Sequence, residues 1–315
     1  MKVRDICMLG GTGFVGRRLV AHLANSGYRV KVLTRHRERH KALLVSPLVT
    51  LIETDVRDPD RLQAEFTGCQ AVINLVGILN GSEAEFRAAH AELPARVAQA
   101  CRQAGARRLL HMSALNADPV NGPSIYLRTK GEGEQAVFGT EGIQVTTFCP
   151  SIIFGPEDSF FNRFAALLKL SPFLPLACPQ ARFAPVYVDD VAQAFAAALE
   201  NEATVGVALE LCGPRIYTLK ELVEYTAQLI GKRRLIVGLP DNLARLQARI
   251  FEHIPGQPFT MDNYLSLQAD SVCCVSGLEA LGIAPHSVEA IMPQHFQSTT
   301  QRGRYSSLRT EARRD

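Results

Sequence analysis

The chain has 315 residues, of which 47% are hydrophobic, and it carries a formal net charge of +3. This length suffices for one large α/β domain with a smaller lobe, and so small a charge gives no argument for nucleic-acid binding. The sequence contains no run of eighteen apolar residues, so we expect no membrane span. We also expect no signal peptide, because glycines interrupt the first apolar run. The eight cysteines include no C-x-x-C pair, so we expect reduced, buried thiols, a cytoplasmic protein and no metal site.

The first predicted element is a short apolar strand, Ile6–Leu9, which runs directly into a glycine-rich turn and a helix. Gly10 permits the tight turn, Gly13 lets the backbone approach phosphates, and Gly16 lets the helix pack closely on the strand. The helix N-terminus offers unpaired N–H groups and the positive end of its dipole to a pyrophosphate. An ordinary turn is the alternative, but the strand and helix on either side favour dinucleotide binding. The predicted contacts are Gly10, Thr12, Gly13, Phe14, Val15 and Gly16.

The second predicted strand, Tyr28–Thr34, ends where dinucleotide-binding folds select between NAD and NADP. An NAD-selective fold usually carries Asp or Glu here, to bind the ribose 2′-hydroxyl. This chain instead continues with Arg35, His36 and Arg37. A guanidinium suits a 2′-phosphate through a charge-assisted contact. We therefore predict NADP(H) in preference to NAD(H), with Arg35 on the phosphate; a solvated basic loop is the alternative.

The third and fourth predicted strands, Val49–Thr54 and Ala71–Leu75, also end in residues expected to contact the cofactor. A carboxylate and a small apolar residue follow the third strand and are expected beside the adenine. The fourth strand runs into a glycine that allows close backbone approach. In chain order, these predicted contacts are Asp55, Val56, Leu75, Val76 and Gly77.

The fifth predicted strand, Arg108–Met112, follows a long helix predicted over 86–105 and places Ser113 at its carboxyl end, where ligands of open α/β sheets lie. Thirteen residues later, Tyr126 and Lys130 stand four apart and share one face of a helix. The lysine can lower the phenol pKa and hold the nicotinamide ribose, while the tyrosine passes a proton to or from a substrate oxygen that the serine steadies. Although Tyr-x-x-x-Lys is common by chance, its position here favours an active site.

With these motifs the chain resembles the extended, atypical branch of the short-chain dehydrogenase/reductase superfamily. The stretch Gly10-Gly-Thr-Gly-Phe-Val-Gly16 is similar to the extended-branch turn, and Ser113, Tyr126 and Lys130 match the superfamily's catalytic positions. The resemblance implies an α/β fold, a Rossmann-type doubly wound parallel sheet with a smaller C-terminal α/β substrate lobe. By the same analogy, the residues from Pro150 to Ile153 are expected near the nicotinamide.

The resemblance also implies a division of the chain into domains. Residues 1–155 are expected to form the NADP(H)-binding Rossmann domain, to which 182–212 return. Residues 156–181 and 213–300 are expected to form a smaller lobe for substrate or partner. The last residues, 301–315, hold five arginines and little that is apolar, so a disordered basic tail is expected there.

Three stretches resemble bacterial relatives of the nucleotide-binding accessory subunit of mitochondrial respiratory complex I (NADH:ubiquinone oxidoreductase): Pro123–Glu134, Phe259–Asn263 and Leu281–Pro285. This resemblance implies tightly held NADP(H) and, in the mitochondrial relatives, a structural role; a related fungal branch is associated with ubiquinone biosynthesis. This chain keeps the catalytic set from which many relatives depart. Cys149 stands where sugar-modifying members usually have arginine, which disfavours a nucleotide-sugar epimerase or dehydratase.

Two apolar segments follow in the smaller lobe. Phe160–Leu176 is interpreted as a core-facing helix, a lid for an apolar substrate, or a surface for membrane or partner. Because it comes soon after Pro150 and is broken by prolines, we expect it to cover the substrate side rather than insert in a bilayer. Further on, Asp241 is expected to cap a helix that carries Leu243, Leu246 and Ile250 on its apolar face.

Two functions of different kinds follow from these features. The first is an oxidoreductase that moves hydride between NADP(H) and a hydrophobic carbonyl or quinone-related compound, linked to respiratory complex I or ubiquinone metabolism. The alternative is a non-catalytic accessory or assembly factor in which the bound nucleotide only stabilises the fold. A nucleotide-sugar epimerase or dehydratase is a third option. The intact catalytic set favours an enzyme. We expect a cytoplasmic protein, with a protein partner in the respiratory chain or quinone synthesis and at most peripheral contact with the inner membrane.

Overall fold

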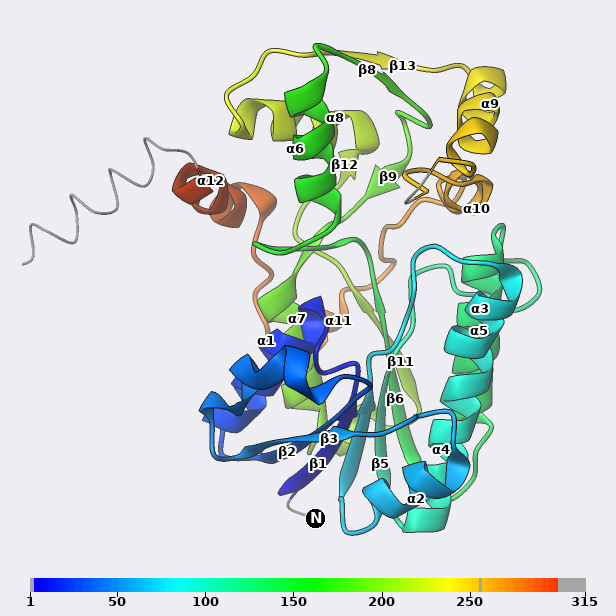
Figure 1. Ribbon diagram of the computed structural model, residues 1–315, viewed down its shortest axis with the longest axis vertical. Coiled ribbons are helices and arrows are strands. Elements are labelled where there is room, and N and C mark those ends of the chain that lie inside the picture. The colour runs from blue at the N-terminus through cyan, green and yellow to red at the C-terminus, as the bar shows by residue number, and fades with distance from the viewer. Residues whose placement is uncertain (1–2, 255–256, 300–315) are drawn as a thin grey trace, which may run out of the picture.

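The computed structural model describes residues 3–254 and 257–299 and contains one large parallel sheet (Figure 1). Its seven strands lie in the order β11-β6-β5-β4-β1-β2-β3, and every adjacent pair is parallel. The chain builds outward from β1 to β3 and then from β4 to β11 on the other side, which confirms the predicted doubly wound sheet. The strands are β1 (Asp5–Leu9), β2 (Arg29–Thr34), β3 (Val49–Glu53), β4 (Ala71–Asn74), β5 (Arg108–Met112), β6 (Gln144–Pro150) and β11 (Val207–Leu211).

Helices cover both faces of the sheet (Figure 1). Along β1, Ile6 and Met8 enter the core shared with α1 and α7, whereas Cys7 and Leu9 enter the core shared with α2 and α4. A parallel sheet buried on both faces needs this continuous apolar sequence. The covering helices are α1 (Phe14–Asn25), α7 (Val188–Ala198) and α11 (Gly277–Ala280) on one face, and α2 (Pro59–Phe66), α4 (Leu93–Ala104) and α5 (Ile125–Phe138) on the other.

The helical segment between β4 and β5 changes its pitch. It runs without a break from α3 (Glu83–Arg87) through one π-helical turn, η2 (Ala88–Glu92), into α4. The helix predicted over 86–105 therefore starts earlier than expected, and His90 lies in its π-helical turn. Turns of this kind are frequent at functional sites. Two 3₁₀ segments complete the large domain, η1 (Arg37–Val45) and η3 (Glu202–Thr204).

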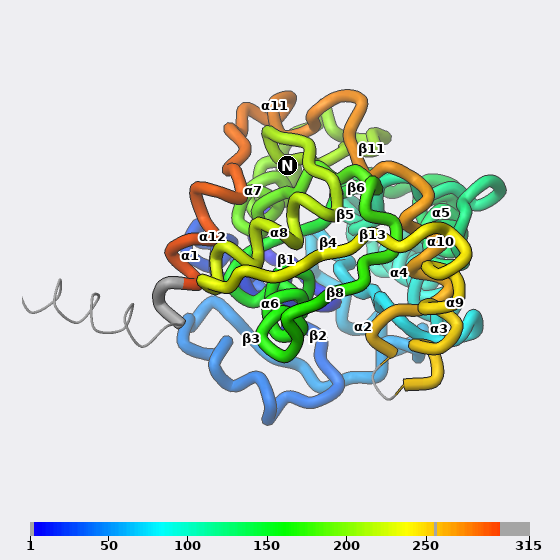
Figure 2. Tube along the Cα trace, turned by 90° about the horizontal axis from the view of Figure 1, so that it is seen from above, coloured from blue at the N-terminus to red at the C-terminus, as the bar shows by residue number. Residues whose placement is uncertain are grey.

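The smaller lobe lies over the carboxyl ends of the strands, at the top of Figure 1 and nearest the viewer in Figure 2. Three helices and two two-stranded sheets, β8–β13 and β9–β12, share its core, and α9 and α10 pack together beside them. Its elements are β7 (Ile153–Phe154), α6 (Phe160–Leu170), β8 (Phe173–Leu176), β9 (Arg182–Phe183), β10 (Val186–Tyr187), β12 (Tyr217–Thr218), α8 (Leu219–Leu229), β13 (Leu235–Gly238), α9 (Asp241–Phe251), α10 (Met261–Ser266) and α12 (Val288–Thr299). The domain boundaries drawn from the sequence stay a prediction, and the tail at 301–315 lies outside the described residues.

The apolar stretch Phe160–Leu176 divides between two environments. Phe161 and Leu168 enter the core of the small lobe, as a core-facing helix should. Leu170 and Phe173 are exposed at the outer end of the lobe. The expectation that the whole stretch covers the substrate side is therefore wrong for its second half, because α6 rises away from the sheet. No helix in the described part of the chain is long and apolar enough to cross a membrane.

The cysteines depart from the prediction of reduced, buried thiols. Cys212 and Cys273 form a disulfide across 61 residues of sequence, and Cys274 is exposed. The fold causes this pairing, because the segment before α11 returns to the end of β11, where the Cys273 N–H lies 3.0 Å from the Cys212 Sγ. Cys7, Cys69, Cys101 and Cys149 are buried free thiols as predicted, and Cys178 is half-buried.

Candidate functional site

The turn between β1 and α1 has the geometry of a phosphate-binding loop. Gly10 has a φ of +76°, and a Cβ there would lie 2.9 Å from the carbonyl carbon of Leu75. The Gly13 N–H donates a hydrogen bond to the Gly10 carbonyl at 3.0 Å. A Cβ on Gly16 would lie 2.2 Å from that same carbonyl oxygen. The first and third glycines are therefore required by packing within the protein, as the spacing predicts.

The N-terminus of α1 is open toward a ligand. Gly13 is its N-cap residue and supplies no side chain to bond the first N–H groups. Among the described residues, a Cβ on Gly13 would meet only the Gly10 carbonyl oxygen, at 3.3 Å, so none of their other atoms fills the space in front of this glycine. The loop thus fits a pyrophosphate, which free N–H groups and the helix dipole attract. Of the remaining predicted contacts, Thr12 is half-buried, Val15 packs on the core, and Phe14 lies beside Gly155.

Arg35 stands exposed at the end of β2 and forms no ion pair with any described residue. The carboxylate nearest in register, Glu53 on β3, accepts a hydrogen bond from the Arg37 N–H at 2.8 Å. Thr34, one residue earlier, is buried. Arg35 is therefore a cation without a protein partner, at the position where a 2′-phosphate is predicted.

The strand ends that follow place the other predicted cofactor contacts. Asp55 is bound by Arg57 at 3.1 Å, a hydrogen bond that lowers the pKa of the Asp55 carboxyl, so this side chain is already engaged by a protein cation. The Leu75 N–H donates to the Leu9 carbonyl at 3.0 Å, which holds the segment after β4 against the glycine turn. Val56 and Val76 pack on one core, and Leu75 packs on the other.

Lys130 and Ser113 meet at the carboxyl end of β5. The buried Lys130 Nζ donates a hydrogen bond to the Met112 carbonyl at 3.0 Å, and burial lowers the pKa of Lys130 to about 8. A Cβ on Gly77 would lie 3.3 Å from this Nζ, so the end of β4 joins the group. The Ser113 Oγ is buried beside the Cys149 thiol and makes no hydrogen bond of ordinary geometry with any described residue. A buried hydroxyl without a partner is costly, and both side chains retain hydrogen-bonding capacity for a ligand.

Tyr126 lies half-buried in the first turn of α5, one turn from Lys130. Burial raises its pKa to about 12, and the Asp262 carboxylate adds to the effect. The prediction that Lys130 lowers the phenol pKa is therefore wrong: the lysine ammonium is directed to the backbone of β5, and α10 brings a carboxylate close to the phenol. A phenol of this kind is protonated at neutral pH.

The N-terminus of α5 is capped by two elements, which sequence reasoning missed. The Ser124 Oγ accepts a hydrogen bond from the Leu127 N–H at 3.1 Å. Asp262 on α10 accepts hydrogen bonds from the Ile125 N–H at 2.6 Å and the Tyr126 N–H at 3.3 Å. The only signal in the sequence was the resemblance at Phe259–Asn263, which did not reveal this contact.

His90 is a second site residue that sequence reasoning missed. Its Nε2 accepts a hydrogen bond from the Ile78 N–H at 3.0 Å, which fixes the loop after Gly77, and its Nδ1 lies 3.3 Å from the Thr129 hydroxyl on α5. Its ring meets the Tyr126 ring edge to face, with centroids 5.2 Å apart. Burial and the charge of Lys130 lower the pKa of His90 to about 3, so the imidazole is neutral.

Polar side chains continue beneath this site along β5 and β6. His111 and Thr147 are paired in register, and the His111 Nε2 and Thr147 Oγ1 atoms are buried without hydrogen bonds. Burial and then the Glu134 carboxylate raise the pKa of the Cys149 thiol. The Leu115 N–H donates to the Pro150 carbonyl at 3.3 Å, which places Pro150 beside the segment that follows Ser113. Ile153 begins β7 and packs on the core.

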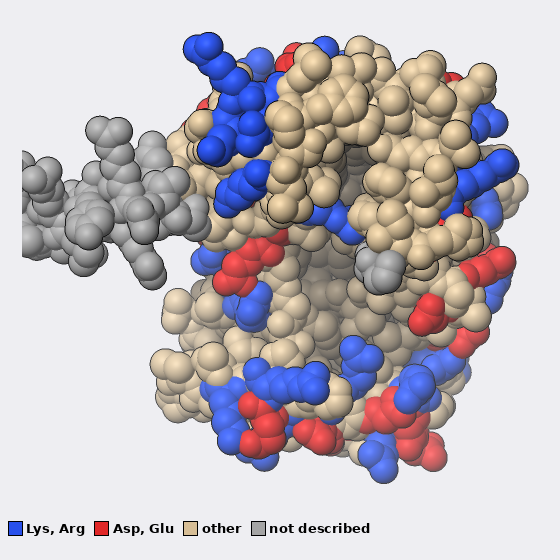
Figure 3. Space-filling model, turned by 45° about the horizontal axis from the view of Figure 1, so that its top comes forward, with Lys and Arg blue, Asp and Glu red and all other residues tan. Residues whose placement is uncertain are grey.

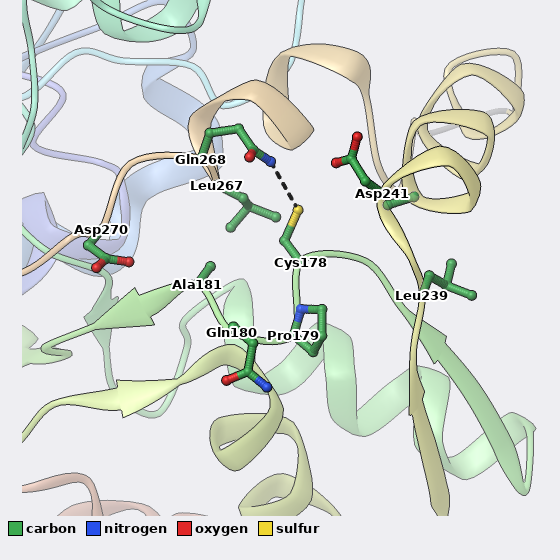
Figure 4. Close-up of a pocket in the computed structure, with 10 residues that line it drawn as sticks. Cys178, Pro179, Gln180, Ala181, Leu239, Asp241, Leu267, Gln268 and Asp270 are labelled. Atoms are coloured by element: carbon green, nitrogen blue, oxygen red, sulfur yellow. Dashed lines mark hydrogen bonds between the residues drawn. The ribbon is translucent and has the colours of Figure 1, made fainter.

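The site lies where the two lobes face each other, and Figure 3 shows the surface hollowed between them. A separate pocket of about 280 Å³ in the small lobe contains none of the predicted site residues (Figure 4). It is lined by residues that include Cys178, whose Sγ lies 3.4 Å from the Gln268 Nε2, and Leu239. Among the described residues, no group of histidine, cysteine, aspartate and glutamate could hold a metal ion.

Comparison with known proteins identifies relatives that are subunits of mitochondrial NADH dehydrogenase and a relative that is by name a reductase. The pattern of the NAD dependent epimerase/dehydratase family matches residues 6–211. Subunit 9 of the NADH dehydrogenase (ubiquinone) 1 alpha subcomplex from Arabidopsis thaliana mitochondria is 31% identical over 301 residues, 90% of this chain and 74% of that protein. Ceramide reductase from Caulobacter vibrioides is 29% identical over 237 residues, 75% of this chain and 74% of that protein.

A solved structure of similar fold is dTDP-glucose 4,6-dehydratase from Streptomyces venezuelae with NAD and TYD bound. It matches with a TM-score of 0.76 and covers 96% of this chain and 99% of its own. Because the two sequences are only 18% identical, this likeness shows the fold alone. Together these matches confirm the family resemblance that the motifs indicated, whereas the roles of the individual site residues stay predictions.

Proposed function

The chain belongs to the NAD dependent epimerase/dehydratase family, within the short-chain dehydrogenase/reductase superfamily, and we propose that it is an NADP(H)-dependent reductase of a hydrophobic carbonyl or quinone-related compound. One observation carries the proposal. Ser113 follows β5 at its carboxyl end, Lys130 bonds the Met112 carbonyl just before it, and Tyr126 lies one helical turn from Lys130. Each of the three retains unused hydrogen-bonding capacity. Among the described residues, the Ser113 hydroxyl has at most the weak thiol of Cys149 beside it and the Tyr126 hydroxyl bonds none, while Lys130 uses one of its three N–H donors.

The protonation states suit reduction. A bound nicotinamide cofactor would supply hydride to the carbonyl carbon. Tyr126, which is protonated at neutral pH, donates its proton to the carbonyl oxygen as that oxygen gains negative charge. Ser113 donates a hydrogen bond to the same oxygen. Lys130 directs its remaining N–H donors to the ribose hydroxyls, and a pKa of about 8 leaves it mostly charged at neutral pH.

Arg35 supports NADP(H) as the cofactor. It is exposed, and no described carboxylate is paired with it. A free guanidinium favours a phosphate dianion over a neutral hydroxyl. The acidic residue that an NAD-selective fold would use here is absent, since the chain continues with Arg35, His36 and Arg37. The Glu53 carboxylate on the neighbouring strand is bonded by the Arg37 backbone.

Two features support an apolar substrate. The relative from Caulobacter vibrioides is by name a reductase of ceramide, a lipid. Cys149, a buried thiol, stands where sugar-modifying members usually carry arginine, which disfavours the nucleotide-sugar option. We infer that the substrate presents a carbonyl on an apolar body.

The test is NADPH oxidation by purified protein with a panel of quinones, long-chain aldehydes and keto-lipids. We expect turnover with at least one of them. Tyr126→Phe should slow it by roughly 10²–10⁴-fold, the usual contribution of a positioned acid–base group, and should leave NADPH affinity nearly unchanged. NADPH that binds tightly but is oxidised by no compound in the panel would contradict the proposal.

A second function, a nucleotide-stapled accessory factor, is favoured by the relatives that are subunits of mitochondrial NADH dehydrogenase. It would give this protein a partner in the respiratory chain, at the cytoplasmic surface of the inner membrane. Complementation of a deletion strain separates the two functions. If Tyr126→Phe restores every phenotype while Gly13→Val restores none, the nucleotide is essential, the chemistry is dispensable, and the protein is an accessory factor.

A further inference from the structure

Helix α9 presents its large apolar side chains to solvent. Leu243, Leu246 and Ile250 are 48%, 51% and 53% exposed, whereas the small residues Ala244 and Ala248 are buried against α10. The sequence predicts the apolar face, which an ordinary surface helix turns toward the core. Here the buried side of α9 carries Ala244 and Ala248, which pack with Tyr264 of α10 and with Ala177, and the stripe of larger apolar residues points outward.

The stripe continues onto the neighbouring strands. The Gln247 Nε2 donates a hydrogen bond to the Pro175 carbonyl on β8 at 3.1 Å. Leu243 and Ile250 lie one turn to either side of Gln247, on the same face of α9 as this bond to β8. The stripe of α9 therefore joins the surface of the β8–β13 ribbon.

The ribbon carries its own exposed apolar residues. Phe173 on β8 is paired in register with Leu235 on β13, and Val237 projects to the same side two residues later. Ile236, between them, projects to the opposite side and enters the lobe core. We call the whole surface the outer face; its apolar residues are Leu167, Leu170, Phe173, Leu235, Val237, Leu243, Leu246 and Ile250.

The unpaired charges of the outer face are positive. Lys169 at the end of α6, Lys232 and Arg233 before β13, and Arg249 on α9 are exposed and form no ion pair with any described residue. The acidic residue at the start of α9, Asp241, is bound by a neighbouring arginine. Figure 3 shows the small lobe with a largely uncharged surface and basic side chains at its edges.

We infer that the outer face docks the protein on an anionic membrane surface. An apolar face flanked by lysine and arginine lies in the boundary between headgroups and acyl chains, and each cation gains from anionic lipid. A second copy of the chain would bring the same four cations against one another. The chain's own segment 301–315 carries five arginines and would be repelled in the same way. Of these candidate occupants, only an anionic lipid surface complements both the apolar and the cationic groups.

The test is sedimentation of the full-length protein with vesicles, either pure phosphatidylcholine or an equal mixture with phosphatidylglycerol. We expect binding to the mixed vesicles that weakens as salt is raised. The stripe variant Leu243→Ser/Leu246→Ser/Ile250→Ser should weaken it by about ten-fold or more. The charge variant Lys169→Gln/Lys232→Gln/Arg233→Gln should weaken it by about a hundred-fold, at about five-fold per cation.

Matched controls on the large domain are Val45→Ser and Arg107→Gln, which remove an exposed apolar side chain and an exposed cation outside the outer face. Both should bind vesicles like the parent. NADPH affinity should be unchanged in every variant, which shows that each has folded and keeps this result separate from the proposed reductase activity. Equal binding to both kinds of vesicle, or equal losses in the controls, would overturn the inference. So would a dimer in sedimentation velocity that only the stripe variant dissociates.

Discussion

The N-termini of α1 and α5 both lie at the carboxyl edge of the sheet, yet the protein completes them in opposite ways. Gly13 leaves the first turn of α1 without a side-chain cap. The first turn of α5 is filled by Ser124 and by the Asp262 carboxylate, which comes from α10 in the other lobe. Each helix end carries the same partial positive charge. At α1 the chain supplies no anion, so this charge is free for the phosphate that we propose as a ligand. At α5 the Asp262 carboxylate takes that place and joins the two lobes.

The two helix ends also differ in how far apart in the sequence the residues that form them lie. The open end of α1 depends on residues within one short stretch of sequence. The closed end of α5 holds Tyr126 between Asp262 and His90, which come from segments far apart in the chain. The position of Tyr126, the proposed proton donor, therefore depends on the small lobe, whereas the proposed phosphate site does not.

The largest expected effect follows from closing the open end. Gly13→Val places a side chain in the space left for the phosphates, where its Cβ meets only one carbonyl oxygen of the protein, at 3.3 Å. Losing about two phosphate hydrogen bonds should cost about 3–6 kcal/mol, roughly 10²–10⁴-fold in NADPH affinity. Titration calorimetry measures this loss, and an unchanged melting temperature without nucleotide shows that the fold is intact. Unimpaired NADPH binding would mean that the phosphates lie elsewhere.

The next prediction concerns the pH dependence of stability, which tests whether His90, beside the N-terminus of α5, is buried and neutral. His90 has a pKa of about 3 in the folded protein against an ordinary 6.5, because burial disfavours its charge. The unfolded state then binds more protons between these values, so stability is full above pH 6.5 and falls as pH drops toward 3. Burial also lowers the pKa of His111 to about 3, so this residue adds to the same loss of stability at low pH. His90→Asn should reduce this slope by about 1.4 kcal/mol per pH unit in urea unfolding; parallel curves for variant and parent would show that His90 is not buried and neutral.

A third prediction concerns the selectivity of the nucleotide site for NADPH over NADH. Arg35→Ala should cost about 1.5–3 kcal/mol of NADPH binding by removing one charge-assisted contact, while NADH binding changes little. The matched control is Arg39→Ala, which removes a second exposed cation of the same loop. Equal losses for the two nucleotides, or a parent that binds NADH more tightly, would place Arg35 outside the 2′-phosphate site.

The smallest effect follows from opening the closed end. Asp262→Ala leaves the Ile125 and Tyr126 N–H groups without their cap, which should cost about 1–2 kcal/mol of unfolding free energy. Asp262→Asn keeps one acceptor oxygen and should cost less. Chemical denaturation measures both, and NADPH affinity should remain that of the parent because α1 is untouched. A stability unchanged in both variants would show that Asp262 does not bind the helix end.

Much of the site could be predicted from sequence because it depends on local periodicity. The run Ile6–Leu9 and the glycine spacing determine the strand, turn and helix together. The four-residue spacing of Tyr126 and Lys130 places them on one helix face, and β5 ends at Met112 as predicted. These features need only residues near one another in the chain.

The partners that complete the site were decided by tertiary structure. Asp262 reaches α5 across 137 residues, and the Cys212–Cys273 disulfide spans 61. His90 lies beside Tyr126 because η2 packs on α5. Such contacts produce no periodic pattern in the sequence, because the two residues lie far apart in the chain and neither determines which residues surround the other.

Helix α9 shows where the two sources of information divide. The sequence by itself determined that Leu243, Leu246 and Ile250 share one face of a helix, because the helical repeat is a local property. Only the tertiary structure decided that this face points outward, since α10 packs with the side of α9 that carries Ala244 and Ala248. Periodicity states which residues lie together, and the shape of the neighbouring element determines which side it buries.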